Sequence, residues 1–308
     1  MMFGLRDTFE YFECHRCGCL QISEIPVDLG KYYPPEYYSF WRPRIEKPNP
    51  IKMLAKMYRL RHFLNDRNLV GLVATKLKGP VLLPGWLKKV NVTPKSRILD
   101  VGCGYGNLLN RLRAEGFSSL LGIDPYLPGD EIYENGVRVL KRRLEEMKGE
   151  FDLIMLHHSF EHMPDPLHAL VTLSGLLARD GVMLIRIPVA SSYAWRRYRT
   201  NWVQLDAPRH LYLHTVESIK ILANAAGLQP VDIEYDSSSF QFWGSEQYER
   251  DIPLNDPLSL SGNAGSPIFT QEQLAEFARG ATELNSKGEG DQACFYIRKQ
   301  PPARPAVL

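Results

Sequence analysis

The chain has 308 residues, of which 44% are hydrophobic and 23% are charged, a composition typical of a globular protein with one large or two modest domains. Its 37 basic and 35 acidic residues nearly balance, so the formal net charge of +2 excludes a general electrostatic attraction to nucleic acid or to an acidic membrane. The odd count of 5 cysteines, one of them inside a glycine-rich turn, argues against a disulfide framework.

The first residues lack the apolar core and cleavage site of a signal peptide. The longest apolar stretch, from Leu69 to Leu83, is interrupted by Lys76, Lys78 and Pro80 and is too short to span a membrane. We therefore expect a cytoplasmic protein without stable membrane insertion. The sequence is silent on the oligomeric state.

Residues 1–45 are predicted to form a degenerate cysteine ribbon followed by an aromatic segment. Cys14 and Cys17 lie in a C-x-x-C-G turn, which would supply two of the four ligands of a structural zinc. We expect no metal here, and a half site at these two cysteines is the alternative. The tyrosines and prolines of residues 31–41 are expected to pack against the main domain rather than to stack on nucleobases.

Residues 46–94 are predicted to be a helical linker or cap. Apolar residues recur at helical spacing between Ile51 and Leu77, among many lysines and arginines, which predicts one or two amphipathic helices. Their basic face is expected to be solvated, and contact with an anionic surface is the alternative. Pro80, Pro84 and Pro94 then mark the passage into the main domain.

The main domain begins with a predicted strand over 97–101, a turn with glycine at every second position, and a helix that ends at about Glu115. Gly102, Gly104 and Gly106 let the backbone approach a ligand with free amides near a helix N-terminus. In a dinucleotide fingerprint the third glycine follows the second by three residues, whereas here it follows by two and Asn107 occupies the dinucleotide position.

Two acidic residues end neighbouring strands in this region. Asp100 closes the first strand, where it can accept hydrogen bonds from a cationic amino-acid group. Asp124 closes the next predicted strand, 120–123, where a carboxylate suits a ribose diol. Because Pro125 follows it, Asp124 could instead be a helix cap or a turn residue. A short third strand is predicted over 136–140.

The next predicted strand, 151–156, runs into a segment with several histidines and then Glu161-His162-Met163-Pro164-Asp165-Pro166. Asp165 and Pro166 suit the start of a helix, so the preceding loop lies at the carboxyl end of a central strand, where open parallel sheets bind ligands. Four histidines within twelve residues also invite a metal interpretation, and we expect no metal at this place.

The remaining elements continue the alternation of strands and helices. We predict a strand over 182–189 after an Asp180-Gly181 turn, a long functional loop over 190–214, a helix capped at Thr215, and a strand over 231–235 that could extend through Trp243. A helix over 270–284 and a last strand over 293–298 complete the domain.

This ordered set of D-x-G-x-G-x-G, Asp124, F-D-L-I with E-H-x-x-D-P, and G-V-M-L-I resembles the class I S-adenosylmethionine-dependent methyltransferases, particularly the ubiquinone- and menaquinone-type enzymes. The resemblance implies an α/β, Rossmann-like seven-stranded sheet with an antiparallel last strand and a small N-terminal appendage. The methyltransferase domain would span residues 95–300, with an insertion at about 244–290 and a disordered tail over 301–308.

The resemblance also implies the site residues. Cofactor-binding positions in such a domain correspond to a set along the first four strands: Asp100, Gly102, Cys103, Gly104, Tyr105, Gly106, Asp124, Pro125, Leu144, Glu145 and His157. The first choice for a catalytic base is His162, followed by His210 and His158, because histidine takes protons near neutral pH. Residues expected to contact the acceptor are Arg209, Glu161 and Trp202.

The wider chain resembles methyltransferases of polysaccharide and surface-glycan biosynthesis, which combine a cysteine ribbon, a Tyr-Tyr-Pro segment and a Pro-Arg-His-Leu loop. We therefore predict S-adenosylmethionine-dependent methyl transfer, at oxygen or carbon, to a small molecule or to a nucleotide-sugar or glycan precursor, without nucleic-acid partners and without zinc. The alternatives are a non-catalytic binding module of the same fold and a dinucleotide-dependent oxidoreductase.

Overall fold

The computed structural model describes residues 2–33, 41–43, 45, 50–64, 68–81, 83–263 and 265–301. Most of the predicted aromatic segment, residues 34–40, and most of the predicted tail, residues 302–308, lie outside the described residues. Within the described chain, no helix is long and apolar enough to cross a membrane.

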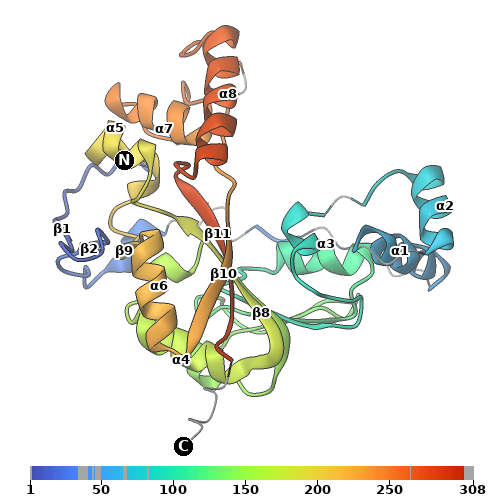
Figure 1. Ribbon diagram of the computed structural model, residues 1–308. Helices are drawn as coiled ribbons and strands as arrows, with labels where there is room; N and C mark the ends of the chain where they lie inside the picture. Colours follow the sequence, from blue (N-terminus) through green and yellow to red (C-terminus); the bar gives the residue numbers. More distant parts are fainter. Residues whose placement is uncertain are drawn as a thin grey trace, which may run out of the picture.

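The centre of the structure is an eight-stranded sheet in the order β10-β11-β8-β7-β3-β4-β6-β5 (Figure 1). Its strands are β3 (Arg97–Val101), β4 (Ser119–Ile123), β5 (Glu131–Ile132), β6 (Arg138–Leu140), β7 (Phe151–His157), β8 (Leu177–Pro188), β10 (Leu228–Tyr235) and β11 (Gln292–Lys299).

The pairing confirms the predicted fold class. The five strands from β8 to β6 pair in parallel, whereas the last strand, β11, is antiparallel to both β8 and β10. The eighth strand is an addition that we did not predict: β5 has only two residues and pairs antiparallel with β6, too short for an alternating pattern to reveal it.

Helices cover both faces of the sheet. On one face lie α3 (Asn107–Glu115), α1 (Pro50–Phe63) and η3 (Gly85–Lys88), and on the other lie α4 (Pro166–Leu176) and α6 (Val216–Ala225) (Figure 1). Strand β7 shows why both faces need cover, since Leu153 and Met155 enter the core under α3 while Ile154 and Leu156 enter the core under α4. The carboxyl edge of the parallel strands is left for a ligand.

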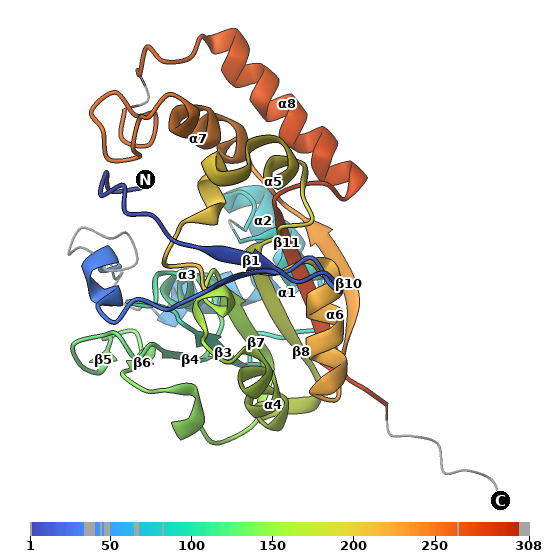
Figure 2. The same ribbon diagram turned by 90° about the vertical axis from the view of Figure 1, so that its left-hand side faces the viewer.

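The predicted N-terminal appendage is a second, three-stranded sheet. Strands β1 (Tyr11–Glu13) and β2 (Leu20–Ile22) form a hairpin, and β2 pairs with β9 (Tyr212–Leu213) from the predicted functional loop. The start of the chain lies beside the segment after α7, where Arg6 pairs with Asp251 (Figure 2). Because β2 pairs with β9, the appendage is joined to the main domain next to His210.

Three local predictions were wrong. The loop 190–214 contains α5 (Tyr193–Tyr198), η6 (Arg199–Asn201), η7 (Val203–Leu205) and β9. Strand β10 does not extend to Trp243, because α7 (Phe240–Glu249) begins there, and the aromatic run that mimics a strand packs as a helix. Strand β8 starts directly after α4, and the Asp180-Gly181 pair lies where its register with β7 shifts.

The other described elements are α2 (Leu69–Lys78), α8 (Gln271–Lys287), η1 (Leu29–Tyr32), η4 (Leu144–Glu146) and η5 (Phe160–His162). Helices α1 and α2 confirm the amphipathic segment, and α8 confirms the last predicted helix.

Candidate functional site

The glycine loop joins β3 to α3 at the carboxyl edge of the sheet. Gly102, Gly104 and Gly106 have φ angles of 73°, 52° and 72°, in the left-handed region that side chains disfavour. A Cβ on Gly102 would lie 2.5 Å from the Cβ of Ser159, and one on Gly106 would lie 2.6 Å from Val139 Cγ2. The loop therefore requires glycine at these positions.

Asp124 is held directly against this loop. Its Oδ2 accepts a hydrogen bond of 2.9 Å from the Gly104 amide, and its Oδ1 accepts one of 2.9 Å from the Tyr126 amide. Burial raises the pKa of Asp124 above its usual value. Each oxygen keeps a further lone pair, so the carboxylate can serve as a turn residue and also face a diol.

Asp100 is a buried carboxyl group, 4% exposed, for which no hydrogen-bond donor is found among the described residues. Burial, and after it the negative charge of Asp124, raises the pKa of Asp100 to about 8. A cationic group placed beside it would stabilise the ionised form. Asp100 thus fits the predicted contact with a cationic ligand.

The side chains beside the loop help to form its walls. Cys103 directs its thiol toward β4, because a Cβ on Gly122 would lie 2.4 Å from Cys103 Sγ. Burial raises the pKa of that thiol well above its usual value. The ring of Tyr105 is largely buried beneath the Arg42 guanidinium, 4.8 Å from its centroid. A bound cofactor would therefore contact Cys103 and Tyr105 chiefly through their backbone atoms.

The other predicted cofactor residues lie along neighbouring strand ends. Pro125 is exposed, whereas Leu144 belongs to the core under α4. Glu145 is exposed, and its carboxylate lies 3.9 Å from the ring of His168. His157 packs against the Trp86 indole with 5.1 Å between ring centroids, and burial lowers its pKa to about 3. Its Nε2 has no hydrogen-bond partner in the described structure.

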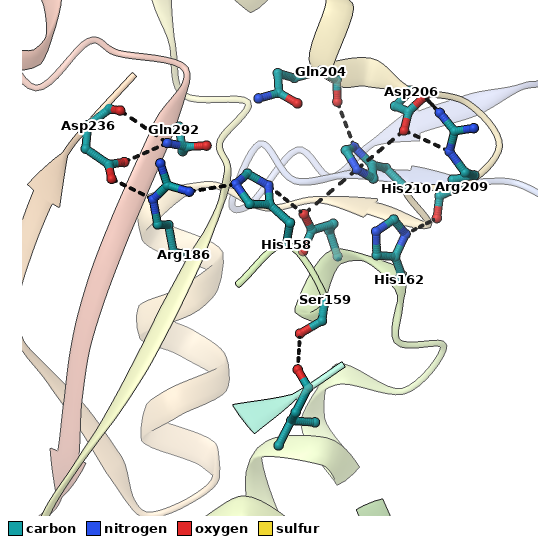
Figure 3. A network of polar contacts seen from close by, with 12 residues as sticks. His158, Ser159, His162, Arg186, Gln204, Asp206, Arg209, His210, Asp236 and Gln292 are labelled. Carbon is teal, nitrogen blue, oxygen red and sulfur yellow. Dashed lines mark hydrogen bonds and ion pairs between the residues drawn. The ribbon is translucent and has the colours of Figure 1, made fainter. Parts of the chain in front are cut away.

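A second group of polar side chains, with His158, His162 and His210 among them, lies beyond β7 (Figure 3), and Glu161 of η5 belongs to it. Glu161 is fully buried, and neither carboxylate oxygen has a hydrogen-bond partner among the described residues. Its Oε1 lies 3.5 Å from His158 Nδ1 and 3.8 Å from His210 Nε2. Burial acts to raise the pKa of Glu161, but the contact with His158, and after it the charges that the facing histidines carry when protonated, outweigh burial and lower this pKa to about 2.

Two histidines of this group have defined tautomers. Nδ1 of His162 lies 2.7 Å from the Arg209 carbonyl, and Nδ1 of His210 lies 2.8 Å from the Gln204 carbonyl. Because a carbonyl can only accept, both Nδ1 atoms carry hydrogen, which leaves Nε2 of each ring for another partner. Burial lowers the pKa of His210 to about 4, although Asp206 acts to raise it, so this ring is neutral at pH 7.

His158 differs, which corrects its predicted role as a base. Its Nε2 lies 3.0 Å from Arg186 Nη1, and a guanidinium can only donate, so the lone pair of His158 is already used. Arg186 is itself held by Asp236, and Asp236 by Gln292. His158 therefore positions Glu161 through Nδ1–H.

Two predicted substrate contacts are also corrected. Arg209 is 3% exposed, and its guanidinium binds the Asp206 carboxylate and donates to the Tyr32 carbonyl at 2.9 Å. Trp202 is fully buried and donates to Asp291 at 3.0 Å. Both residues support the loop from inside, and Glu161, the third predicted contact, is likewise buried.

Sequence reasoning missed Tyr33 and Asp206. The Tyr33 hydroxyl lies 3.4 Å from His162 Nδ1, and its ring stacks on Tyr126 with 6.3 Å between centroids. The only signal was the general expectation that the aromatic segment packs against the main domain. Nothing in sequence spacing places residue 33 beside residue 162.

The three cysteines of the appendage are free. Backbone amides of Cys17 and Arg16 lower the pKa of Cys14, whereas burial raises that of Cys17. Cys19 is buried, with its sulfur 3.9 Å from His214 Nδ1.

Comparison with known proteins gives consistent relatives. A ubiquinone biosynthesis O-methyltransferase from Bordetella avium is 29% identical over 186 residues, which cover 54% of this chain and 70% of that protein. The enzyme of the same name from Actinobacillus pleuropneumoniae is 30% identical over 122 residues, which cover 35% of this chain and 52% of that protein, about half its length.

Among solved structures, a mycolic acid cyclopropane synthase complexed with SAH and CTAB aligns with a TM-score of 0.45 and 18% identity, covering 82% of this chain and 99% of that chain. The methyltransferase domain family matches residues 57–233, more than half of the chain, a range that includes the glycine loop, Glu161 and His210. The chain therefore belongs to the methyltransferase domain family and is an S-adenosylmethionine-dependent methyltransferase.

Proposed function

We propose that this protein transfers a methyl group from S-adenosylmethionine to an oxygen or carbon atom of a small molecule, with phenolic compounds and nucleotide-sugar or glycan precursors as the candidate acceptors. The observation that carries this proposal is the contact between the two sites. Gly102 of the cofactor loop packs so tightly on Ser159 that no Cβ fits between them, and Ser159 is two residues from Glu161. A donor at the loop and an acceptor at the Glu161 group would lie side by side.

The glycine loop fits a cofactor with a diol and a cationic end, because it offers backbone amides, Asp124 and the unpartnered Asp100. Leu144 and Glu145 would flank the base of the nucleoside. Bound S-adenosylmethionine supplies a methyl group already activated on a sulfonium centre. The remaining work of the protein is to align the acceptor and to take its proton.

His162 is the proposed proton acceptor. Its Nδ1–H is committed to the Arg209 carbonyl, which orients the ring and leaves Nε2 to receive the proton of the acceptor. His210 has the same tautomer and is the second candidate, but it is more deeply buried. The named activity of the relatives, O-methylation in ubiquinone biosynthesis, supports a hydroxyl acceptor.

The test is to incubate the purified protein with methyl-labelled S-adenosylmethionine and two acceptor pools, phenolic quinone precursors and nucleotide sugars, and to identify the labelled product. We expect His162→Gln to lower the rate by about 100-fold or more, in the range of general-base catalysis. The matched control is His15→Gln, an exposed histidine of the N-terminal appendage that should have no effect. Binding of S-adenosylhomocysteine without transfer to either pool would favour the binding-module alternative.

A further inference from the structure

Among the described residues, the ion pairs of the buried Glu161 carboxylate are with His158 and His210, and not with an arginine or a lysine. The two nearby guanidinium groups are committed elsewhere, Arg209 to Asp206 and Arg186 to Asp236. In the described structure, both Glu161 oxygens are buried without a hydrogen-bond partner. A buried carboxylate without hydrogen bonds is costly unless a cation compensates it. The observed side chains therefore leave a place for a positive charge.

The geometry around Glu161 indicates where that charge belongs. His210 Nε2 lies 3.8 Å from Glu161 Oε1 and also 3.8 Å from Asp206 Oδ2, while Nδ1 of the same ring is taken by the Gln204 carbonyl. The ligand-forming atoms of Glu161, His162 and His210 all lie within 4.8 Å of one another. Two ligands of one metal ion with bonds of about 2.1 Å are separated by about 3 to 4 Å. The pair of His210 and Glu161 already has this spacing.

The hydrogen bonds behind the three side chains are those of metal ligands. His162 and His210 each donate Nδ1–H to a backbone carbonyl, which fixes the tautomer with Nε2 free (Figure 3). The Nδ1–H of His158 faces the Glu161 oxygen from the other side, at 3.5 Å. Such outer contacts orient a metal-binding carboxylate and imidazoles before the ion arrives.

We propose that Glu161, His162 and His210 bind a divalent transition-metal ion, with Zn²⁺ as the best match. Two imidazole nitrogens and one carboxylate favour Zn²⁺ and its first-row neighbours over Mg²⁺ and Ca²⁺, which prefer oxygen ligands. Three protein ligands leave a coordination position open. This proposal departs from the expectation from sequence that no metal binds at this place, which followed from the resemblance to the methyltransferase family and not from the histidine spacing.

The role of the ion in methyl transfer rests on the proposed function, whereas the binding of the ion to the three side chains does not. An acceptor hydroxyl that occupies the open position would lose its proton more readily, because a metal ion lowers the pKa of a bound oxygen. With the ion bound, the two imidazoles would serve as ligands, and the proton of the acceptor would pass to water instead of to His162. In the metal-free protein His162 takes that proton.

The experiment is a metal titration of the full-length protein after treatment with a chelator. Because Cys14 and Cys17 could also take an ion, the Cys14→Ser/Cys17→Ser variant serves as the background. In this background we expect one equivalent of Zn²⁺ to bind with a Kd in the micromolar range or tighter by calorimetry. Co²⁺ should give the visible absorption of a site with nitrogen and oxygen ligands and no thiolate band.

Glu161→Gln and His210→Gln, each made in the same background, are expected to weaken Zn²⁺ binding by at least 100-fold, and His168→Gln to leave it unchanged. The affinity for S-adenosylhomocysteine is measured for every variant, so that failure of the metal site is separated from failure of the cofactor site. Should either Gln variant not fold, the Co²⁺ spectrum of the background protein decides.

The proposal is overturned if the background protein binds no ion up to millimolar Zn²⁺, since a proton on a histidine then balances Glu161. It is equally overturned if Glu161→Gln and His210→Gln, in this cysteine-free background, bind Zn²⁺ as tightly as the background protein does.

Discussion

The proposed cofactor edge, residues 100–124, and the proposed acceptor cluster of Glu161, His162 and His210 share one end of the same sheet but are built in different ways. The cofactor edge uses backbone amides of one loop and two carboxylates from adjacent strand ends. The acceptor cluster uses side chains from segments about fifty residues apart, closed over by the N-terminal segment through Tyr33 and Tyr11. One site depends on backbone conformation, and the other on long-range packing.

This difference predicts that single substitutions act locally. A change in the glycine loop should abolish cofactor binding and spare the cluster, and a change in the support of the cluster should do the reverse. The following experiments test that separation.

The largest effect is expected for Gly104→Asp. The residue has a φ of 52°, and its amide donates to Asp124, so the substitution adds backbone strain and a second negative charge beside that carboxylate. We expect the affinity for S-adenosylhomocysteine to fall by more than about 100-fold, or about 2.7 kcal/mol, in calorimetry.

Gly262→Asp provides the matched control, because Gly262 is exposed and a Cβ there meets no atom within 4 Å. Unchanged cofactor affinity in Gly104→Asp would contradict the assignment of the loop. Loss of Zn²⁺ binding in the same variant would contradict the independence of the two sites.

A smaller effect is expected from the titration of Asp100. Its pKa is about 8 in the folded protein and near 3.8 when unfolded, so between these values the folded state holds a proton that the unfolded state has lost. Raising the pH from 5 to 8 should therefore reduce the free energy of unfolding through Asp100, by up to about 1.4 kcal/mol per pH unit.

Asp100→Asn removes this titration, so its stability should fall less steeply than that of the wild type in urea unfolding followed from pH 5 to pH 8. Asp124 faces Asp100 and is unchanged in both proteins, which makes the difference in slope the informative quantity. Equal slopes would show that Asp100 does not carry the raised pKa.

The smallest effect is expected for Trp202→Phe. The substitution keeps an aromatic ring in the core but removes the hydrogen bond to Asp291, whose pKa burial raises to about 6. We expect a loss of about 1 to 3 kcal/mol in the free energy of unfolding, typical of a lost buried hydrogen bond.

Affinities for S-adenosylhomocysteine and for Zn²⁺ should be unchanged in Trp202→Phe. A selective loss of methyl transfer with normal stability would instead restore Trp202 as an acceptor contact and contradict the separation of the two regions.

The contrast between the two regions also explains which parts of the fold could be predicted from the sequence. The bounds of β3 and α3 and the role of Asp165 as a helix cap match the prediction, because they depend on neighbours within a few residues. The failures, at residues 190–214 and 236–243, are segments whose conformation depends on what they pack against. Aromatic residues there satisfy a strand pattern and a helix equally well.

The sequence by itself determined the parallel sheet, the glycine loop and the cofactor class, since left-handed φ angles need glycine and strand ends of a parallel sheet meet at one edge. Only the tertiary structure decided which polar side chains remain available to a ligand. Arg209, Trp202 and His158 have the residue types of a functional site, but their partners Asp206, Asp291 and Arg186 use up their donors and lone pairs. Among the described residues the Glu161 oxygens have no hydrogen-bond partner, and only the fold brings His210 to the group that Glu161 forms with its neighbours His158 and His162.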